Sequence, residues 1–267
     1  MGYTILPSDL SSESFALRVS RGLVPGVVGV NKFGNAPDGL QVTETDIWAR
    51  ADATPTQQIW LAPTDARIHA IVSTSTSDDG APVGVGARTI RVRGLKTWDS
   101  LETYEDVILN GTTPVNTASS YVSINRMVVL TSGATSINVG VITATAATDS
   151  TITAVILAGQ GQTQQAIYAL GSQTNFYMSG FSVTIGSQVA AHRASCTIKV
   201  CAQPETVPTV FTHKHKINVV AQGTSARLHQ FIPPLRIDGP AIIKLSGVAS
   251  AADIDAAGHF DGNLIQE

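Results

Sequence analysis

The sequence predicts an all-β protein, an antiparallel β-sandwich of jelly-roll type with an extended N-terminal arm. Short runs rich in Val, Ile and Thr recur along the chain between turn residues, a pattern typical of sandwiches and barrels. No long window has the 3.6-residue apolar period of an amphipathic helix. Within Glu105–Ala144, the Asn110-Gly111 pair separates two β-branched runs and predicts a hairpin, since both central residues of a type I′ turn need positive φ.

Residues 1–40 are expected to form the arm, because Gly and Pro interrupt this segment and no apolar period persists in it. The alternation within Ser14–Arg21 is compatible with a short strand. Three apolar side chains of the arm, Phe15, Leu17 and Phe33, cannot bury themselves in so open a segment. We expect them to form an interface, either with the chain's own domain or with a neighbouring subunit.

Residues 41–249 are expected to form the sandwich domain, with residues 250–267 as a C-terminal tail. Two prolines within residues 203–210 mark either a subdivision of this domain or a loop. Regular short strands with turn residues between them favour a sandwich over alternating strands and helices. The expected strands are residues 41–49, 57–61, 66–73, 88–95, 104–109, 121–131, 139–144, 151–157, 163–170, 175–185, 195–202, 214–221, 226–231 and 241–246.

Composition narrows the classes of function. The 267 residues are 14% charged and 6% aromatic, with a net charge of −3, so no global field favours nucleic acid or an anionic membrane. No stretch approaches the roughly 20 apolar residues of a membrane span, and the first residues lack a signal-peptide pattern. Cys196 and Cys201 would lie on opposite faces of one strand and could not pair with each other, which indicates a reducing compartment.

The motifs that could hold a ligand are incomplete. Asp253, Asp255 and Gly258 match part of a calcium loop, but two ligand positions of that loop fail. His213 and His215 are two apart on a strand and would share a face, without an identifiable third metal ligand. Asp78–Gly80 and Gly159–Gln162 read as turns, and Trp48, Trp60 and Trp98 as core or interface anchors, with a sugar platform as the alternative. We expect no metal and no cofactor.

An enzyme or lectin on a sandwich scaffold is the alternative from another class. It would need two carboxylates roughly 5 to 10 Å apart, as in glycoside hydrolases. Four acids cluster near one hairpin, and we interpret them as solvated turn residues with no catalytic role: Asp99, Glu102, Glu105 and Asp106.

Several segments of the sequence resemble segments of virion structural proteins of tailed bacteriophages. They include VNKFGNAPDG (Val30–Gly39), DVILNGTTPVNT (Asp106–Thr117), YVSINRMVVLTSG (Tyr121–Gly133) and AGQGQTQQAIYAL (Ala158–Leu170). The resemblance covers most of residues 15–185 and transfers no functional residue. It implies synthesis in the host cytoplasm and incorporation into a virion.

The resemblance and the low-charge surface lead to a non-enzymatic capsid decoration or cement protein as the expected function. Its expected partners are copies of itself, with a trimer favoured, and the major capsid protein or tail proteins, with no nucleic acid and no membrane. A neck, tail or fibre component that contacts a receptor or glycan is the alternative.

Overall fold

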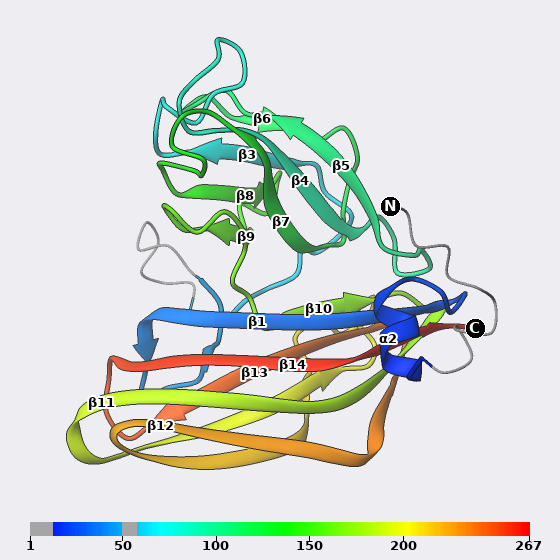
Figure 1. The fold of residues 1–267 in the computed structure, drawn as a ribbon, viewed down its shortest axis with the longest axis vertical. Coiled ribbons are helices and arrows are strands. Elements are labelled where there is room, and N and C mark those ends of the chain that lie inside the picture. The colour runs from blue at the N-terminus through cyan, green and yellow to red at the C-terminus, as the bar shows by residue number, and fades with distance from the viewer. Residues whose placement is uncertain (1–12, 50–57) are drawn as a thin grey trace, which may run out of the picture.

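The computed structural model describes residues 13–49 and 58–267, with the side chains of residues 188–191 and 222 excepted. Its described elements are one short helix and a series of strands that all pair antiparallel, which confirms the all-β prediction (Figure 1). The elements are α2 (Phe15–Ser20), β1 (Val27–Leu40), β2 (Thr45–Asp46), β3 (His69–Ser73), β4 (Ala87–Leu95), β5 (Thr103–Ile108), β6 (Val115–Asn116), β7 (Ser123–Ser132), β8 (Ile142–Ala146), β9 (Ile152–Ile156), β10 (Ile167–Leu170), β11 (Thr174–Cys201), β12 (Thr212–Asp238), β13 (Ala241–Ala249) and β14 (Ile254–Gln266).

A long hairpin that bends back on itself builds the larger unit. Strands β11 and β12 pair along their whole length, with a register break at Ser187/His192 that divides both strands into halves. The first half of β11 also pairs with β14, and its second half pairs with β13. The two layers therefore have strand orders β1-β14-β11-β12 and β2/β10-β13-β11-β12. This is a jelly roll, in which one folded hairpin contributes to both sheets.

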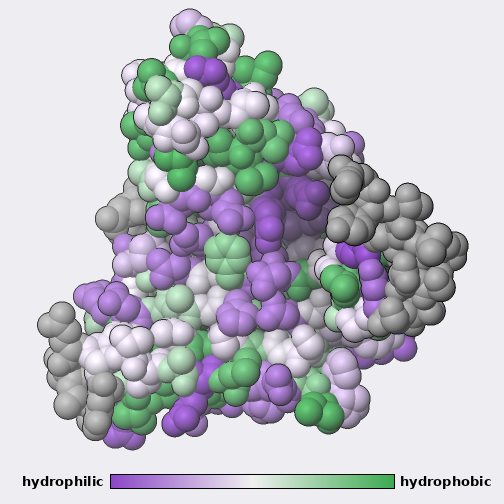
Figure 2. Space-filling model, in the orientation of Figure 1, coloured by the Kyte–Doolittle hydropathy of each residue, from purple (hydrophilic) through white to green (hydrophobic). Residues whose placement is uncertain are grey.

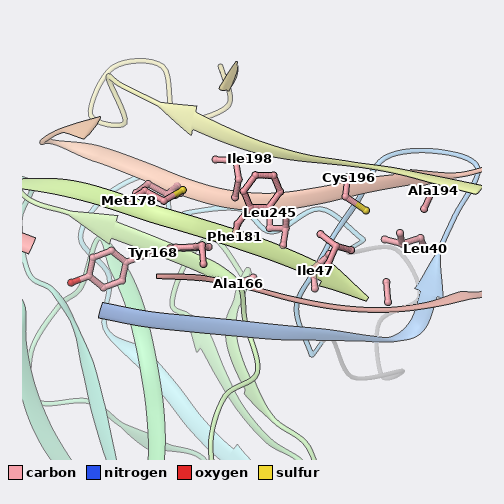
Figure 3. Packing of buried hydrophobic residues seen from close by; sticks show 14 of the residues in the cluster. Leu40, Ile47, Ala166, Tyr168, Met178, Phe181, Ala194, Cys196, Ile198 and Leu245 are labelled. Atoms are coloured by element: carbon pink, nitrogen blue, oxygen red, sulfur yellow. The ribbon is translucent and has the colours of Figure 1, made fainter. Parts of the chain in front are cut away.

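Alternating side chains of the two layers meet in one core. On the first half of β11, Phe176 and Met178 point inward, and a bulge between Met178 and Gly180 shifts the alternation so that Phe181 also points inward. The second half contributes Ile198, opposite Leu245 of β13. Figure 3 shows Phe181, Ile198 and Leu245 directed toward one another between the layers. Burial of this apolar surface stabilises the fold by about 25 cal/mol per Å².

A second unit is inserted within a single strand of the jelly roll. Strands β2 and β10 both pair with β13, and Ala166 N donates to Ile47 O at 2.9 Å, so the two strands are halves of one interrupted strand. The chain between them forms β3 to β9, which lie above the jelly roll in Figure 1. Gly34 of β1 crosses this break, and a Cβ there would lie 2.3 Å from Ile47 O. Only glycine allows that approach.

The inserted unit is a sandwich of its own. Its sheets have strand orders β6-β3-β8-β9 and β5-β4-β7, and a separate apolar core fills the space between them. Short alternating strands such as β3 and β8 direct every second side chain into that core. At its lower end, Trp48 and Trp60 belong to a third cluster that also contains Ile242 of β13, so apolar packing joins the two units.

Polar side chains also fix the junction of the two units. The Asn125 side chain on β7 donates to Ala169 O and accepts from Ala169 N of β10, both at 2.9 Å. Gln165 Nε2 donates to Ile124 O at 3.0 Å. These side chains imitate backbone pairing between strands that belong to different sheets, and thereby satisfy buried donors and acceptors.

The domain boundaries predicted at the two ends of the chain are wrong. Residues 27–40 of the expected arm are β1, and most of the expected tail is β14; these two strands pair with each other from Val27↔Ile265 to Leu40↔Ile254. Residues 1–12 lie outside the described residues. The short strand expected over Ser14–Arg21 is helix α2, because the Ser14 hydroxyl caps its first turn and Gly22, at φ +69°, ends it.

The prediction of a hairpin at Asn110-Gly111 is also wrong. Gly111 has the predicted positive φ, but β5 before it pairs with β4, whereas β6 after it pairs with β3 of the other sheet. The turn therefore carries the chain from one layer of the inserted unit to the other. The backbone N–H of Gly111 donates to Asp78 O, so a long-range contact has replaced the local strand pairing.

Candidate functional site

The most exposed feature of the jelly roll is strand β12, which runs along the margin of both layers. Its described partner is β11 on one side only, so its other side is an open edge. Exposed edges of this length are templates for pairing with another chain. We refer to β12, Thr212–Asp238, as the β12 edge.

Large apolar side chains face solvent on this edge. The side chain of Ile232 is 89% exposed and that of Leu228 is 64% exposed, and Val220 is also exposed. Pro233 and Pro234 cannot donate a hydrogen bond, which limits strand pairing to the rest of the edge. The β12 edge therefore combines open backbone groups with apolar contact area.

The β12 edge is basic, in contrast to the whole chain. Lys214, Lys216, Arg227 and Arg236 stand against one acid, Asp238, while the chain as a whole has a net charge of −3. The remainder of the chain is therefore acidic overall. Charge complementarity favours contact between this edge and an acidic surface, and disfavours pairing of two β12 edges with each other.

Stacked rings close the core behind the β12 edge. His215 and His229 come from the two halves of β12, and their ring centroids are 3.7 Å apart. Phe181 and Phe231 pack against both histidines. Burial, and then the charge of His229, lower the pKa of His215. The four rings therefore form one packed cluster at the open margin of the sandwich.

The expectation that His213 and His215 share a face is wrong. His213 pairs with Lys199 while His215 pairs with Ile198, so Lys214 is an extra residue at a register shift. An extra residue reverses the alternation that follows it. His213 lines an outer hollow with Lys216, whereas His215 points to the core. No group of three or more His, Cys, Asp or Glu that could hold a metal occurs within residues 13–49 and 58–267.

The three predicted interface residues lie at two places. Phe15 and Leu17 are exposed on α2, while Val19 of the same helix is buried and packs near Gly29 of β1. Phe33 lies further along β1, half-buried beside a shallow hollow of about 280 Å³. The structure keeps Phe15 and Leu17 together and Phe33 apart, and their role as an interface stays a prediction.

The acids considered for catalysis have structural partners. Asp106 forms a bidentate pair with Arg91 at 2.8 and 2.9 Å, and this contact lowers the pKa of Asp106. Glu105 accepts from the backbone N–H groups of Ala118 and Ser119. The other two accept from side chains: Glu102 accepts from Asn125 within the inserted unit, and Asp99 accepts from Ser172 of the jelly roll.

The remaining motifs are parts of the framework. Asp253 lies in the turn before β14, while Asp255 and Gly258 lie on β14, where an extended strand cannot wrap a cation as a calcium loop does. Gly159 and Gly161 have positive φ in the turn between β9 and β10, as predicted. Asp78 is buried and accepts four hydrogen bonds, from Ser73, Ala87, Val139 and Gly140. Of the three tryptophans, Trp48 and Trp60 are buried core anchors and Trp98 packs beside them.

Two of the buried lysines, Lys32 and Lys244, have almost no local sequence signal of their burial. Lys244, within the apolar run of β13, binds the buried Asp46 at 2.9 Å. Lys32, within the expected arm, is buried at the junction and donates to Asn125 O. Each is a single Lys in an apolar or Gly-rich segment, and its partner lies far away in the sequence. Only the odd presence of Lys on a buried strand could have drawn attention to Lys244.

No described helix of residues 13–49 and 58–267 is long and apolar enough to cross a membrane. No protein-family model matches the chain, and no curated protein matches it. Among solved structures, "Structure of infectious bursal disease virus Gx strain" is 10% identical, with a TM-score of 0.25 over 90% of this chain and 72% of that chain. "D431N Mutant VP2 Protein of Infectious Bursal Disease Virus; Derived T=1 Particles" is 11% identical, with a TM-score of 0.24 over 90% and 69%. At such TM-scores, nothing about the function of this chain follows from them.

Proposed function

We propose that this chain is a non-enzymatic structural component of a virus particle, in its finer form a capsid decoration or cement protein of a tailed phage. The phage resemblance of residues 15–185 supports the class of particle. The β12 edge carries the proposal for the role, because an open strand with exposed Leu228 and Ile232 is a surface for protein contacts. The described acids of the candidate catalytic cluster, in turn, are engaged in structural contacts.

The charge distribution favours a contact between unlike surfaces. A basic β12 edge fits the acidic remainder of a second copy, and such a head-to-tail contact closes into a ring when the rotation allows it. A ring of identical copies is the arrangement expected of a protein placed at a symmetry axis of a shell. A trimer is the favoured ring.

A neck, tail or fibre component is the second candidate, and the inserted unit favours it. That unit projects from the jelly roll, and the loop between β3 and β4 lies at its far end (Figure 1). Val83 and Val85 in this loop are exposed, which suits contact with a receptor. Copy number in purified particles separates the candidates: hundreds of copies support decoration, and around a dozen or fewer support a tail part.

Self-association through the β12 edge is directly testable. The wild-type chain should sediment as a closed oligomer, and the double variant Leu228→Lys/Ile232→Lys should weaken association at least about tenfold, because two buried apolar contacts become charged. Sedimentation velocity over a concentration series measures this. The matched control Val83→Lys/Val85→Lys charges the exposed loop of the inserted unit and should leave association unchanged. A monomeric wild type, or equal loss in both double variants, would contradict a role for the β12 edge.

A further inference from the structure

The junction between the two units contains a hollow that the proposed function does not use. It has a volume of about 250 Å³ and lies between β1 of the jelly roll and strands β4 and β7 of the inserted unit. In Figure 2, hydrophilic side chains gather along this junction, where the surface is recessed. The charged or polar residues that line it are Asn31, Lys32, Arg93, Glu102, Asn125, Arg126 and Tyr168.

Three cations surround this junction hollow, with one carboxylate between them. Lys32 is only 3% exposed and donates to Asn125 O, while Arg126 donates to Asn31 O at 2.8 Å. Both cations are therefore held in place by backbone carbonyls, which carry no formal negative charge. Glu102 is the one lining acid, and it accepts from the Asn125 side chain at 2.9 Å.

The arrangement of the two arginines opposes stability. Arg93 of β4 and Arg126 of β7 are directly opposite each other in the antiparallel register. Like charges at opposed positions destabilise a sheet. Burial lowers the pKa of Arg126, Glu102 raises it, and the charge of Arg93 lowers it by a smaller amount. An anion bound between the two arginines would offset their mutual repulsion.

The buried ammonium group of Lys32 also destabilises the junction in the absence of an anion. Burial and the nearby Arg126 lower its pKa to about 7, against a smaller raising effect of Glu102. Burying an ammonium group beside a guanidinium is unfavourable unless a counter-charge is supplied. Tyr168 is 5% exposed on the same wall and brings a hydroxyl that can donate a hydrogen bond.

We propose that the junction hollow binds a phosphate dianion, either free or as the end group of a small organic phosphate. Three cations less one carboxylate leave a net charge that matches a dianion. Guanidinium groups bind phosphate oxygens in pairs, and the buried ammonium supplies a further charge-assisted donor. Because the hollow is lined by both units, its ligand would hold the inserted unit against the jelly roll.

Isothermal titration with inorganic phosphate and with glycerol 3-phosphate, at constant ionic strength, tests the site. Saturable binding of either probe is expected, and the tighter of the two identifies the source of the phosphate group. Arg93→Gln should weaken binding at least about tenfold, since one charge-assisted contact is lost. The matched control Arg88→Gln lies on the same strand outside the hollow and should bind as the wild type does.

Stability without ligand separates a binding site from a structural cluster. Arg93→Gln should melt at the same temperature as the wild type or higher, because it removes the opposed like charge, yet it should lose the rise in melting temperature that phosphate causes. A lower melting temperature in the absence of phosphate would show that Arg93 is structural. A phosphate response no larger than that to chloride at equal ionic strength would overturn the proposal.

Protonation of Lys32 gives a second readout. The charge of sulfate does not change around pH 7. The affinity of the hollow for sulfate should therefore fall as the pH rises through about 7, where Lys32 loses its proton. The Lys32→Met variant should bind sulfate weakly and without this pH dependence. If the affinity of the wild type for sulfate did not depend on pH, Lys32 would not take part in binding.

Discussion

Replacing Asp46 by alanine should lower the free energy of unfolding by about 3–5 kcal/mol, because it leaves the buried ammonium of Lys244 without its partner. Both side chains are almost inaccessible, at 0% and 4% exposed, and lie 2.9 Å apart. The same carboxylate accepts from the Ser246 hydroxyl at 2.5 Å and from Trp60 N at 2.8 Å. Burial acts to raise the pKa of Asp46, and these donors and Lys244 act against it.

A double-mutant cycle makes this prediction specific. Urea unfolding of Asp46→Ala, Lys244→Met and the double variant measures the coupling, and the double variant should recover much of the loss, because no buried charge remains unpaired. The control Asp238→Ala breaks the exposed pair with Arg236 and should change the stability little, because solvent screens that pair. A loss for Asp46→Ala no larger than that of the control would show that water reaches Lys244.

Acidification should destabilise the inserted unit through His69. This side chain is fully buried, and its Nδ1 lies 3.0 Å from Arg67 O, a geometry that suits donation to that carbonyl. Burial lowers its pKa from 6.5 to about 4, against smaller raising effects of Arg67 O and Asp149. The unfolded chain therefore binds a proton at a higher pH than the folded chain. The contribution of His69 to the free energy of unfolding is fully present above pH 6.5. It declines by roughly 3 kcal/mol in total as the pH falls toward about 4.

Urea unfolding at neutral pH and near pH 4 measures this dependence. In His69→Asn, the amide can replace the Nδ1 donor without titrating, so the loss of stability between the two pH values should shrink by most of that amount. His213→Asn removes an exposed imidazole and serves as the matched control. Equal pH dependence in the wild type and His69→Asn would mean that folding does not change the pKa of His69.

The fold class could be predicted because period-two alternation and turn residues are local signals. The jelly roll agrees with the alternation in β11, where Phe181, Val183 and Ile185 share the inner face. The ends of the chain could not be predicted in the same way. Strand β1 contains Gly and Pro, and it is a strand because β14 pairs with it from the far end of the sequence.

The candidate sites depended even more on long-range placement. Arg93 and Arg126 become neighbours only through strand register, and Lys32 reaches them from another unit. The inward position of His215 depends on the extra residue at Lys214, which no local pattern announces. The interpretation of the acids near β5 as solvated turn residues missed their partners, because Arg91, Ala118 and Ser119 reach Asp106 and Glu105 only through the fold.

The interrupted strand of the jelly roll has a consequence for the order of folding. The halves β2 and β10 can align only after the chain between them has brought Trp48 and Gln165 together, where they form an isolated bridge. Closing so long a loop costs conformational entropy if the loop is a flexible coil. If the insert has already folded through its own short-range pairings, its two ends are adjacent, and joining β2 to β10 costs little further entropy. The inserted unit should therefore fold first and act as the template on which the interrupted strand is completed. Its rapid folding then limits how long the β12 edge and the unpaired β13 stay exposed to aggregation.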